Sequence, residues 1–346
     1  MSGKSSAARR KPSMADVADL AGVSVMTVSN VINRPAIVSE ATQAKVHAAM
    51  RELRYRNNLV ARSLRLAQPR QIAYVLPARD AVGNEYMDAF LHDLAAACQE
   101  ADRNLALVTE QGTEALMTAC ENLYFGQSAA GFIISNVESA DPRPVELRKR
   151  GLPFAAYGRT GEAFASPWSW AEADAALGIA TAVDHVADRG HRELAFVGAD
   201  PDSVTMVQRE IGYRDACLRR GLTRSVADDR IVHCGRDLAT GVHVAAGLLE
   251  AVTPPTAIIC VADPLAAGVV IAMQGRDLVP GRDVAVTGYD DTPLTSFGTV
   301  GITSVRQPST RIAAELVRLV IDRPEEPEHL LLPPTLVVRS STDPAP

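Results

Sequence analysis

The chain has 346 residues, which is more than one compact domain usually holds, so we expect two or three domains. Its composition, with 47% hydrophobic and 22% charged residues, is that of a soluble globular protein. No window offers the ~18 uninterrupted apolar residues of a membrane span, and no apolar segment of a secretory signal follows the basic residues 1–12. We therefore expect a cytoplasmic protein that does not contact a membrane.

Cysteine and histidine give no sign of a metal or redox centre. The five cysteines form no C-x-x-C pair, and the seven histidines are equally scattered. Neither a disulfide nor a metal site is therefore expected, and the sequence indicates no cofactor.

Charge is distributed unevenly along the chain. Residues 1–70 contain 12 Lys and Arg against 4 Asp and Glu, a net charge of +8, whereas the remainder carries −14. A basic head on an acidic body is typical of a protein that places one end on a polyanion. The alternative is a disordered basic tail, but regular helical patterns begin directly after Lys11.

The first ordered segment predicts a small domain of three short helices. Ser13 is the expected N-cap of the first helix, and Asp16 favours the positive end of its dipole. Gly22 breaks that helix, Ser24 caps a second and Ser39 caps a third. Apolar residues recur at helical spacing through all three helices: Val17, Ala18, Leu20 and Ala21; Val25, Val28, Val31 and Ile32; Val46, Ala49, Met50 and Leu53.

The first two of these helices have the residue pattern of a helix-turn-helix. Two helices that cross closely need a small residue, here Ala18, and a glycine in the turn, here Gly22. The inner face of the second helix needs apolar residues, and Val28 and Val31 supply them. The sequence therefore predicts a helix-turn-helix that binds double-stranded DNA.

The outer face of the second helix is then expected to enter the major groove. Val25, Met26 and Asn30 point outward by helical spacing, while Thr27 and Ser29 can reach phosphates. Asn pairs bidentately with adenine, and Val and Met pack on thymine methyl groups. The alternative for Asn30 is a solvated side chain without a base contact.

A second texture begins after Pro69, where short apolar strands alternate with helices. The expected strands are Ile72–Leu76, Leu105–Thr109, Gly131–Ser135, Phe154–Tyr157, Leu194–Gly198, Ala257–Val261 and Val284–Gly288. Helical stretches between them include Met87–Ala101, Ala175–Arg189, Gln208–Arg220 and Ala239–Ala251. This alternation predicts doubly wound parallel sheets, and its length predicts two α/β lobes.

Several motifs together resemble the lactose-repressor (LacI) family. They are Asp16-Val-Ala-Asp-Leu-Ala-Gly-Val-Ser24, Thr27-Val-Ser-Asn-Val-Ile-Asn33, Val38-Ser-Glu-Ala-Thr42, Asn58-x-x-Ala-Arg-Ser-Leu64, Gly190-His-Arg192, Arg209-x-x-Gly-Tyr213, Gly288-Tyr-Asp-Asp-Thr-Pro293 and Thr303-Ser-Val-Arg-Gln-Pro308. The resemblance runs from Ser13 to Arg339. It implies an all-α headpiece (residues 1–57), a hinge helix and linker (58–69), and a body (70–346) that resembles periplasmic binding proteins.

The resemblance also implies boundaries within the body and a set of DNA-binding residues. The first lobe is expected at about 70–160 plus 294–323, and the second at about 161–293 plus 324–340. The expected DNA contacts are Ser24, Val25, Met26, Thr27, Ser29, Asn30, Tyr55, Asn58 and Leu64. Leu64 matches the leucine that wedges into the minor groove and kinks the operator. Most members have Arg where this chain has Asn30, so its operator half-site should deviate from the usual one.

Parallel α/β lobes bind ligands at the carboxyl ends of their strands, in the cleft between them. Polar candidates follow predicted strands, and the resemblance adds others. The expected effector-binding residues are Tyr86, Asn136, Arg159, Arg209, Asp263, Asp290 and Gln307. The alternative for Asp263 and Asp290 is a helix cap or a turn. Ala262 and Arg236 depart from the pattern of sugar-responsive members, which suggests an acidic or otherwise unusual carbohydrate-like ligand.

The resemblance implies an allosteric homodimer on a near-palindromic operator. A ligand that closes the cleft would shift the first lobes and separate the hinge helices. Most relatives are repressors released by a sugar, and a minority need a corepressor. Two other classes are weighed: a periplasmic receptor would need a signal peptide and no headpiece, and an enzyme would need a catalytic motif. Residues 126–131 are not a nucleophile elbow, and no phosphate loop is present.

Overall fold

The computed structural model describes residues 12–55, 69–76, 85–109, 112–161, 166–198, 203–222, 228–296, 298 and 300–342. The chain divides into two compact units, Met1–Ala67 and Gln68–Pro346. Each unit is described by itself, the first as the headpiece and the second as the body. The expected fold class, a helical headpiece followed by a two-lobed α/β body, is confirmed.

The headpiece contains the three expected helices. They are α1 (Met14–Ala21), α2 (Val25–Asn33) and α3 (Glu40–Glu52), with a 3₁₀ turn, η1 (Pro35–Ile37), between the last two. Ser13 and Asp16 form a capping box at the start of α1, because the hydroxyl of Ser13 accepts from the Asp16 N–H and the Asp16 carboxylate accepts from the Ser13 N–H. Gly22 ends α1 with a φ of +66°.

The other two caps differ from each other. Ser24 caps α2 as expected, because its Oγ accepts the Thr27 N–H at 3.0 Å. Ser39 lies at the N-cap position of α3 but makes no cap hydrogen bond. Its hydroxyl pairs with the Thr42 hydroxyl at 2.9 Å instead, so the expected N-cap position of Ser39 is confirmed, although no side-chain hydrogen bond caps the helix.

Residues from all three helices form the headpiece core. Its buried members are Val17, Ala18, Val28, Val31, Val46, Ala49 and Tyr55. Every apolar residue of the predicted helix-turn-helix pattern therefore lies in this core, where it holds α1 against α2. The opposite face of α2 does not contribute to this core.

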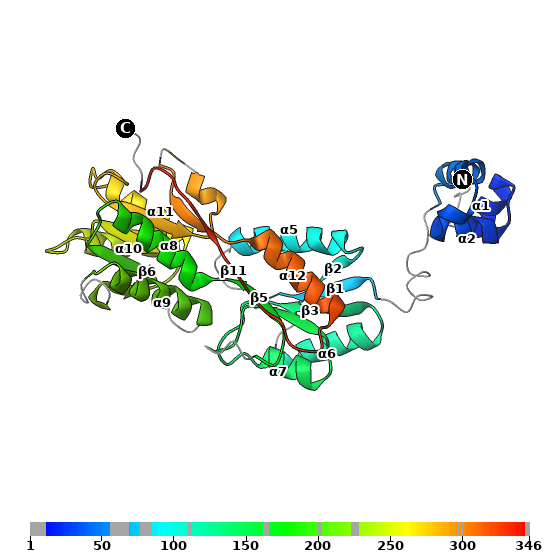
Figure 1. Ribbon diagram of the computed structural model, residues 1–346, viewed down its shortest axis with the longest axis horizontal. Coiled ribbons are helices and arrows are strands. Elements are labelled where there is room, and N and C mark those ends of the chain that lie inside the picture. The colour runs from blue at the N-terminus through cyan, green and yellow to red at the C-terminus, as the bar shows by residue number, and fades with distance from the viewer. Residues whose placement is uncertain are drawn as a thin grey trace, which may run out of the picture. The chain divides into compact units, whose positions relative to one another are not determined.

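The body contains two six-stranded sheets (Figure 1). The first has the order β11-β5-β4-β3-β1-β2, and all its strands are parallel. Its strands are β1 (Gln71–Val75), β2 (Asn104–Val108), β3 (Ala129–Ile134), β4 (Phe154–Tyr157), β5 (Trp170–Ala173) and β11 (His329–Leu332). We call this sheet and its helices the first lobe.

The second sheet has the order β12-β10-β9-β8-β6-β7, and only β12 runs antiparallel to its neighbour. Its strands are β6 (Leu194–Gly198), β7 (Ile231–His233), β8 (Ala257–Cys260), β9 (Ala285–Tyr289), β10 (Thr303–Arg306) and β12 (Thr335–Val337). This sheet and its helices form the second lobe.

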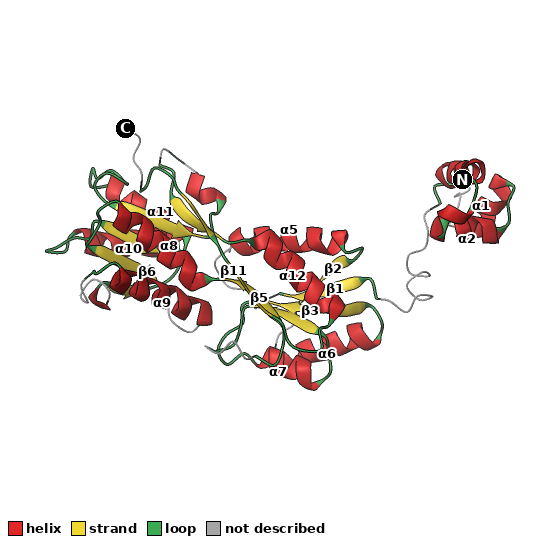
Figure 2. Ribbon diagram, in the orientation of Figure 1, coloured by secondary structure: helices red, strands yellow, loops and turns green. Residues whose placement is uncertain are grey.

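Helices cover both faces of each sheet (Figure 2). In the first lobe, α5 (Glu85–Glu100) and α12 (Ser309–Asp322) share one core, whereas α6 (Thr113–Phe125) and α7 (Pro142–Lys149) share another. In the second lobe, α8 (Ala175–Asp188) packs with α9 (Val204–Arg219), and α10 (Leu238–Leu249) packs with α11 (Asp263–Gln274). Gly288 faces α11 and its neighbour Tyr289 faces α8, so these pairs lie on opposite faces.

The expected lobe boundaries are wrong in three places. Strand β5 belongs to the first lobe rather than the second, β10 belongs to the second rather than the first, and β11 belongs to the first rather than the second. The chain therefore passes between the lobes after β5, after β10 and after β11. These strands have only four residues each. Polar residues interrupt β5 and β10, and the apolar run of β11 is only three residues long, so none of them stands out in the sequence.

Among the described helices, no single one is long and apolar enough to span a membrane. By length and composition alone, α1 and α2 would pass such a test only as a pair, bent by 104°.

Candidate functional site

Helix α2 separates its residues into two faces, as its periodicity predicts. Val28 and Val31 are almost fully buried, whereas the side chains of Val25 and Met26 are 47% and 70% exposed. Asn30 is half-buried. Two large apolar side chains exposed at the start of one helix have no role in the headpiece core, so they are available to a partner surface.

Hydroxyl groups gather at the N-terminus of α2. The Ser24 and Thr27 hydroxyls lie 2.9 Å apart, and Ser29 lies two residues after Thr27 in the helix. The positive end of the helix dipole and its free N–H groups favour an anion here. Exposed Arg34, Lys45, Arg51 and Arg54 add positive charge to the headpiece. Within residues 12–55, however, Asp16, Asp19, Glu40 and Glu52 balance these four charges, so it is the hydroxyls and N–H groups at the start of α2 that suit a phosphate.

The remaining predicted DNA contacts fall in two groups. Tyr55 is 9% exposed and its ring belongs to the headpiece core, so its packing stabilises the domain. A contact between Tyr55 and DNA stays a prediction. Asn58 and Leu64 lie outside the described residues, together with the rest of the expected hinge helix at residues 58–68.

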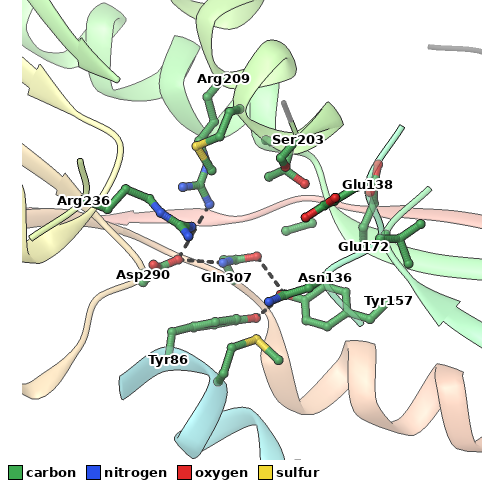
Figure 3. Close-up of a pocket in the computed structure, with 17 residues that line it drawn as sticks. Tyr86, Asn136, Glu138, Tyr157, Glu172, Ser203, Arg209, Arg236, Asp290 and Gln307 are labelled. Carbon is green, nitrogen blue, oxygen red and sulfur yellow. Dashed lines mark hydrogen bonds and ion pairs between the residues drawn. The ribbon is translucent and has the colours of Figure 1, made fainter. Parts of the chain in front are cut away.

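The body has a cavity of about 190 Å³ between the two lobes (Figure 3). The first lobe contributes Tyr86, Met87, Asn136, Val137, Glu138, Tyr157, Gly158, Glu172 and Ala173. The second lobe and the segment after β10 contribute Ala175, Ser203, Thr205, Met206, Arg209, Arg236, Asp290 and Gln307. Most of its polar residues follow or end a strand, which is where α/β lobes place ligand contacts.

A chain of hydrogen bonds crosses the cavity from one lobe to the other. The Tyr157 hydroxyl donates to Gln307 Oε1 at 3.1 Å, and Gln307 Nε2 donates to Asp290 Oδ1 at 2.7 Å. The Tyr86 and Tyr157 hydroxyl oxygens lie 2.5 Å apart. Because Tyr157 gives its one proton to Gln307, Tyr86 is the donor in that pair. Gln307 thus connects a first-lobe tyrosine to a second-lobe carboxylate.

Arg209 completes this chain in the second lobe. Its Nη2 lies 3.7 Å from Asp290 Oδ1, and its Nη1 donates to the Val261 carbonyl at 2.6 Å. The guanidinium group also lies 3.6 Å from the centre of the Tyr289 ring. These contacts fix the position of the Arg209 guanidinium group. Asp290 connects it to Gln307 and Tyr157.

Burial sets the protonation of the cavity's acids and phenols. It raises the pKa of Asp290, against the opposing effects of Arg209 and Gln307. It raises the pKa of Tyr86 and Tyr157 well above the usual phenol value, so both hydroxyls stay protonated and can donate. Burial also raises the pKa of Glu172 to about 7, although Arg159 opposes that shift.

Three residues at the carboxyl ends of strands hold a left-handed backbone. Asn136, Asp290 and Asp291 have φ values of +49°, +98° and +50°. Asn and Asp tolerate this region better than other residues with a side chain, but it still costs free energy. Such strain is typical of positions where backbone geometry aims a side chain at a site.

Five of the seven predicted effector residues line the cavity. They are Tyr86, Asn136, Arg209, Asp290 and Gln307. A contact between these residues and a ligand stays a prediction. Arg159 and Asp263 do not line the cavity, and the structure gives each of them another role.

Arg159 lies behind the cavity wall. Its Nε is 2.9 Å from Glu172 Oε1, and its guanidinium lies 5.4 Å from the centre of the Trp170 ring. The side chain is only 3% exposed, so the predicted ligand contact is replaced by an ion pair with a residue that does line the cavity.

Asp263 is fully buried at the start of α11. Its carboxylate accepts the Ser304 hydroxyl and the Thr292 N–H, both at 2.6 Å. A Cβ on Gly288 would lie 2.3 Å from Asp263 Oδ1, so this carboxylate packs against the β9 backbone. Asp263 therefore joins α11, β10 and the segment after β9. The alternative of a helix cap is wrong, because no side-chain hydrogen bond caps α11.

Sequence reasoning missed five polar lining residues: Glu138, Tyr157, Glu172, Ser203 and Thr205. Tyr157 ends a strand that was predicted, so the strand-end rule already pointed to it. Glu172 lies in β5, a strand without an apolar run, and its buried carboxylate becomes apparent only beside Arg159.

Two family descriptions match this chain. Residues 13–58 match the bacterial regulatory proteins of the lacI family, and residues 183–342 match the periplasmic binding protein-like domain. The ribose operon repressor of Escherichia coli (strain K12) is 30% identical over 332 residues, which cover 95% of this chain and 99% of that protein. The transcriptional regulator CelR of Thermobifida fusca is 32% identical over 343 residues, 96% of this chain and 99% of CelR.

Solved structures agree along nearly the whole chain. The Lac repressor dimer bound to operator and the anti-inducer ONPF is 25% identical with a TM-score of 0.76, covering 96% of this chain and 99% of that one. A complex of CelR with cellobiose is 27% identical with a TM-score of 0.70, covering 95% and 99%. Headpiece and body thus occur together in the same order in both.

Proposed function

Because the chain belongs to the LacI family of bacterial regulatory proteins, we propose that it represses transcription from a near-palindromic operator under the control of a small carbohydrate-like effector. The observation that carries this proposal is the combination of two surfaces in one chain. Helix α2 of the headpiece exposes side chains that suit base edges, and a polar cavity lies between the lobes of the body.

The headpiece supplies sequence recognition through α2. Exposed Val25 and Met26 suit thymine methyl groups, and Asn30 suits an adenine edge. Hydroxyls of Ser24, Thr27 and Ser29 set the register on phosphates. Leu64 extends this interface into the minor groove, and Asn58 contacts the DNA backbone.

The cavity supplies control. Its carboxylates, amides and arginines can pair with the hydroxyls of a polyol, and Tyr86 and Tyr157 offer ring surface beside them. The relatives include a ribose operon repressor and a regulator solved with cellobiose, which supports a carbohydrate-like effector. Tyr86, Asn136, Arg209, Asp290 and Gln307 are its proposed contacts.

Gln307 gives the effector a way to act on DNA binding. It lies where the chain passes from β10 to α12, and it bonds to Tyr157 of one lobe and Asp290 of the other. A ligand that replaces either bond changes the relative free energies of two lobe arrangements. Operator affinity and effector affinity must then be coupled reciprocally.

A homodimer matches these features, because a two-fold axis in the protein reads a palindrome. The Lac repressor dimer on its operator, a structural neighbour, supports this assembly. A regulator of bacterial DNA works in the cytoplasm, and the named relatives are regulators, which supports a role without catalysis.

The proposal is tested by selection of operators from random DNA with the full chain, followed by binding titrations. We expect an enriched sequence with two inverted half-sites. A thermal-shift screen against sugars, sugar acids and nucleosides then finds stabilising compounds. At least one of them should change operator affinity, downward for an inducer and upward for a corepressor. Failure to enrich any inverted repeat would contradict the proposed function.

A further inference from the structure

The two walls of the cavity carry opposite charge. The first-lobe wall presents the carboxylates of Glu138 and Glu172. Glu172 is paired with buried Arg159, which leaves Glu138 as the uncompensated charge on that side. Within the described residues, Glu138 makes no side-chain ion pair or hydrogen bond.

The second-lobe wall presents two guanidinium groups and one carboxylate. Arg209 comes from α9 and Arg236 from the segment between β7 and α10, and Figure 3 shows both side chains reaching toward Asp290. Asp290 Oδ1 already accepts from Gln307 at 2.7 Å and lies 3.7 Å from Arg209. One carboxylate cannot neutralise two guanidinium groups, so this wall carries a net positive charge.

Arg236 interacts with Asp290 only through its charge, which acts to lower the pKa of that carboxyl. Across the ranges that the structure describes, it makes no hydrogen bond or ion pair, whereas Arg209 has three partners in Asp290, the Val261 carbonyl and the Tyr289 ring. Its side chain is exposed and lines the cavity. Ser203 and Thr205, which also line the cavity, add hydroxyl donors near the start of α9.

A neutral ligand would leave this charge uncompensated as it excludes water from the cavity. Desolvating a charged group without an opposite charge is costly. A carboxylate or phosphate removes that cost, because both pair with the fork of an arginine through two parallel hydrogen bonds. On the opposite wall Glu138 repels an anion but accepts hydrogen bonds from hydroxyls.

We propose that Arg236 is the anion-binding residue of the cavity and that the effector is an anionic carbohydrate, a sugar acid or a sugar phosphate. Its charged group pairs with Arg236 in the second lobe, and its hydroxyls face Glu138 and Asn136 in the first. This inference rests on the proposed function for the identity of the cavity as an effector site. It adds the charge of the effector and its orientation.

The test uses the full chain, an Arg236→Gln variant and a matched Arg148→Gln variant. Arg148 is exposed on α7, outside the cavity lining, and its substitution removes the same charge. Thermal unfolding is measured in sodium phosphate and in sodium chloride at equal ionic strength. We expect phosphate to raise the Tm of the wild type and of Arg148→Gln above the chloride value. Arg236→Gln should lose more than half of that difference.

A second arm identifies the anion. Neutral aldoses are titrated in parallel with their aldonic acids, uronic acids and phosphate esters. We expect the tightest binder to be anionic, with the acid or phosphate series showing which anion it carries. Its Kd should rise about 10- to 100-fold in Arg236→Gln, because the variant loses a hydrogen bond between charged groups. Arg236→Lys keeps the positive charge and should restore part of the affinity.

Two results would overturn the inference. A phosphate effect equal in all three proteins contradicts it, whatever the titrations return. So does a neutral compound as the tightest binder with an affinity unchanged in Arg236→Gln. Failure of the proposed function has a different signature: phosphate still protects through Arg236, but no compound changes operator affinity.

Discussion

The headpiece and the body place their functional residues in opposite ways. In the headpiece, Val25 and Met26 stand exposed on one face of α2 while Val28 and Val31 hold the core from the other. In the body, Asp290 and Gln307 belong to a hydrogen-bond chain that joins two lobes. Recognition of DNA can therefore change without a change in fold, whereas a change in ligand recognition also alters how the lobes are connected.

The largest expected effect is that of Val28→Asp, which should abolish the function of the headpiece and leave the body unchanged. Val28→Asp places an unpaired carboxylate in a fully buried position and should unfold the headpiece. Operator binding, measured by fluorescence anisotropy, should be lost, while the thermal unfolding of the body stays unchanged. The matched variant Val25→Asp lies on the exposed face and should keep the helical circular dichroism of the headpiece.

The opposite result would break the comparison. If Val28→Asp bound operator within about threefold of the wild type, a range close to RT in free energy, the two faces of α2 would not be divided as described.

Asp290→Ala should act on the body alone. Its loss leaves Arg209 buried without its carboxylate and Gln307 without an acceptor. Asp290 is also a proposed effector contact, and a hydrogen bond to a charged group contributes about 1.5–3 kcal/mol, so calorimetry should show effector affinity falling by at least about 10-fold. The variant should still bind operator in the absence of effector. An unchanged effector titration would rule out the role of Asp290.

The raised pKa of Glu172 predicts how stability depends on pH. Its carboxyl has a pKa of about 7 in the folded body, against 4.5 when unfolded, so the folded state binds the proton more tightly. That contribution is fully present below pH 4.5 and is lost as pH rises to 7. Between those values, the stability of the wild type relative to Glu172→Gln should fall by about 3 kcal/mol.

Urea unfolding of both proteins at several pH values measures this difference. Asp263 titrates in the same range, because burial raises its pKa to about 7, but it is present in both proteins and cancels. A wild-type-minus-variant difference that is flat with pH, or that grows as pH rises, would contradict the assigned protonation of Glu172.

Asn30→Arg should alter DNA specificity by the smallest amount. One bidentate contact to a base contributes about 1–3 kcal/mol of discrimination. We expect the selected half-site to move toward the one common in the family, without a change in effector affinity. Selections from random DNA compare the two proteins, and identical sequence logos would show that residue 30 does not read a base.

The sequence predicts the headpiece better than the body for a physical reason. Ser13, Gly22 and Ser24 act through local hydrogen bonds and backbone angles, which neighbouring residues determine. Ser39 shows the limit of such prediction. The sequence places it at the N-cap of α3, but it does not show that its hydroxyl pairs with the Thr42 side chain rather than with a backbone N–H.

In the body, the seven apolar strand runs all form strands, yet β5, β7, β10, β11 and β12 were not foreseen. Three to four residues with polar members give no clear period, so their pairing depends on contacts far along the chain. The same limit applies to the cavity. Asp290 and Asp263 both follow a strand, but only the packing of Ser304 and Thr292 around Asp263 shows that its carboxylate is occupied.

Effector control of the headpiece by the body is tested most directly by one linked titration. The operator Kd of the full chain is measured with and without the tightest-binding compound, and the Kd of that compound is measured with and without operator. We expect the same factor in both directions, about 5- to 150-fold. A compound that binds the cavity tightly while leaving the operator Kd unchanged would contradict it.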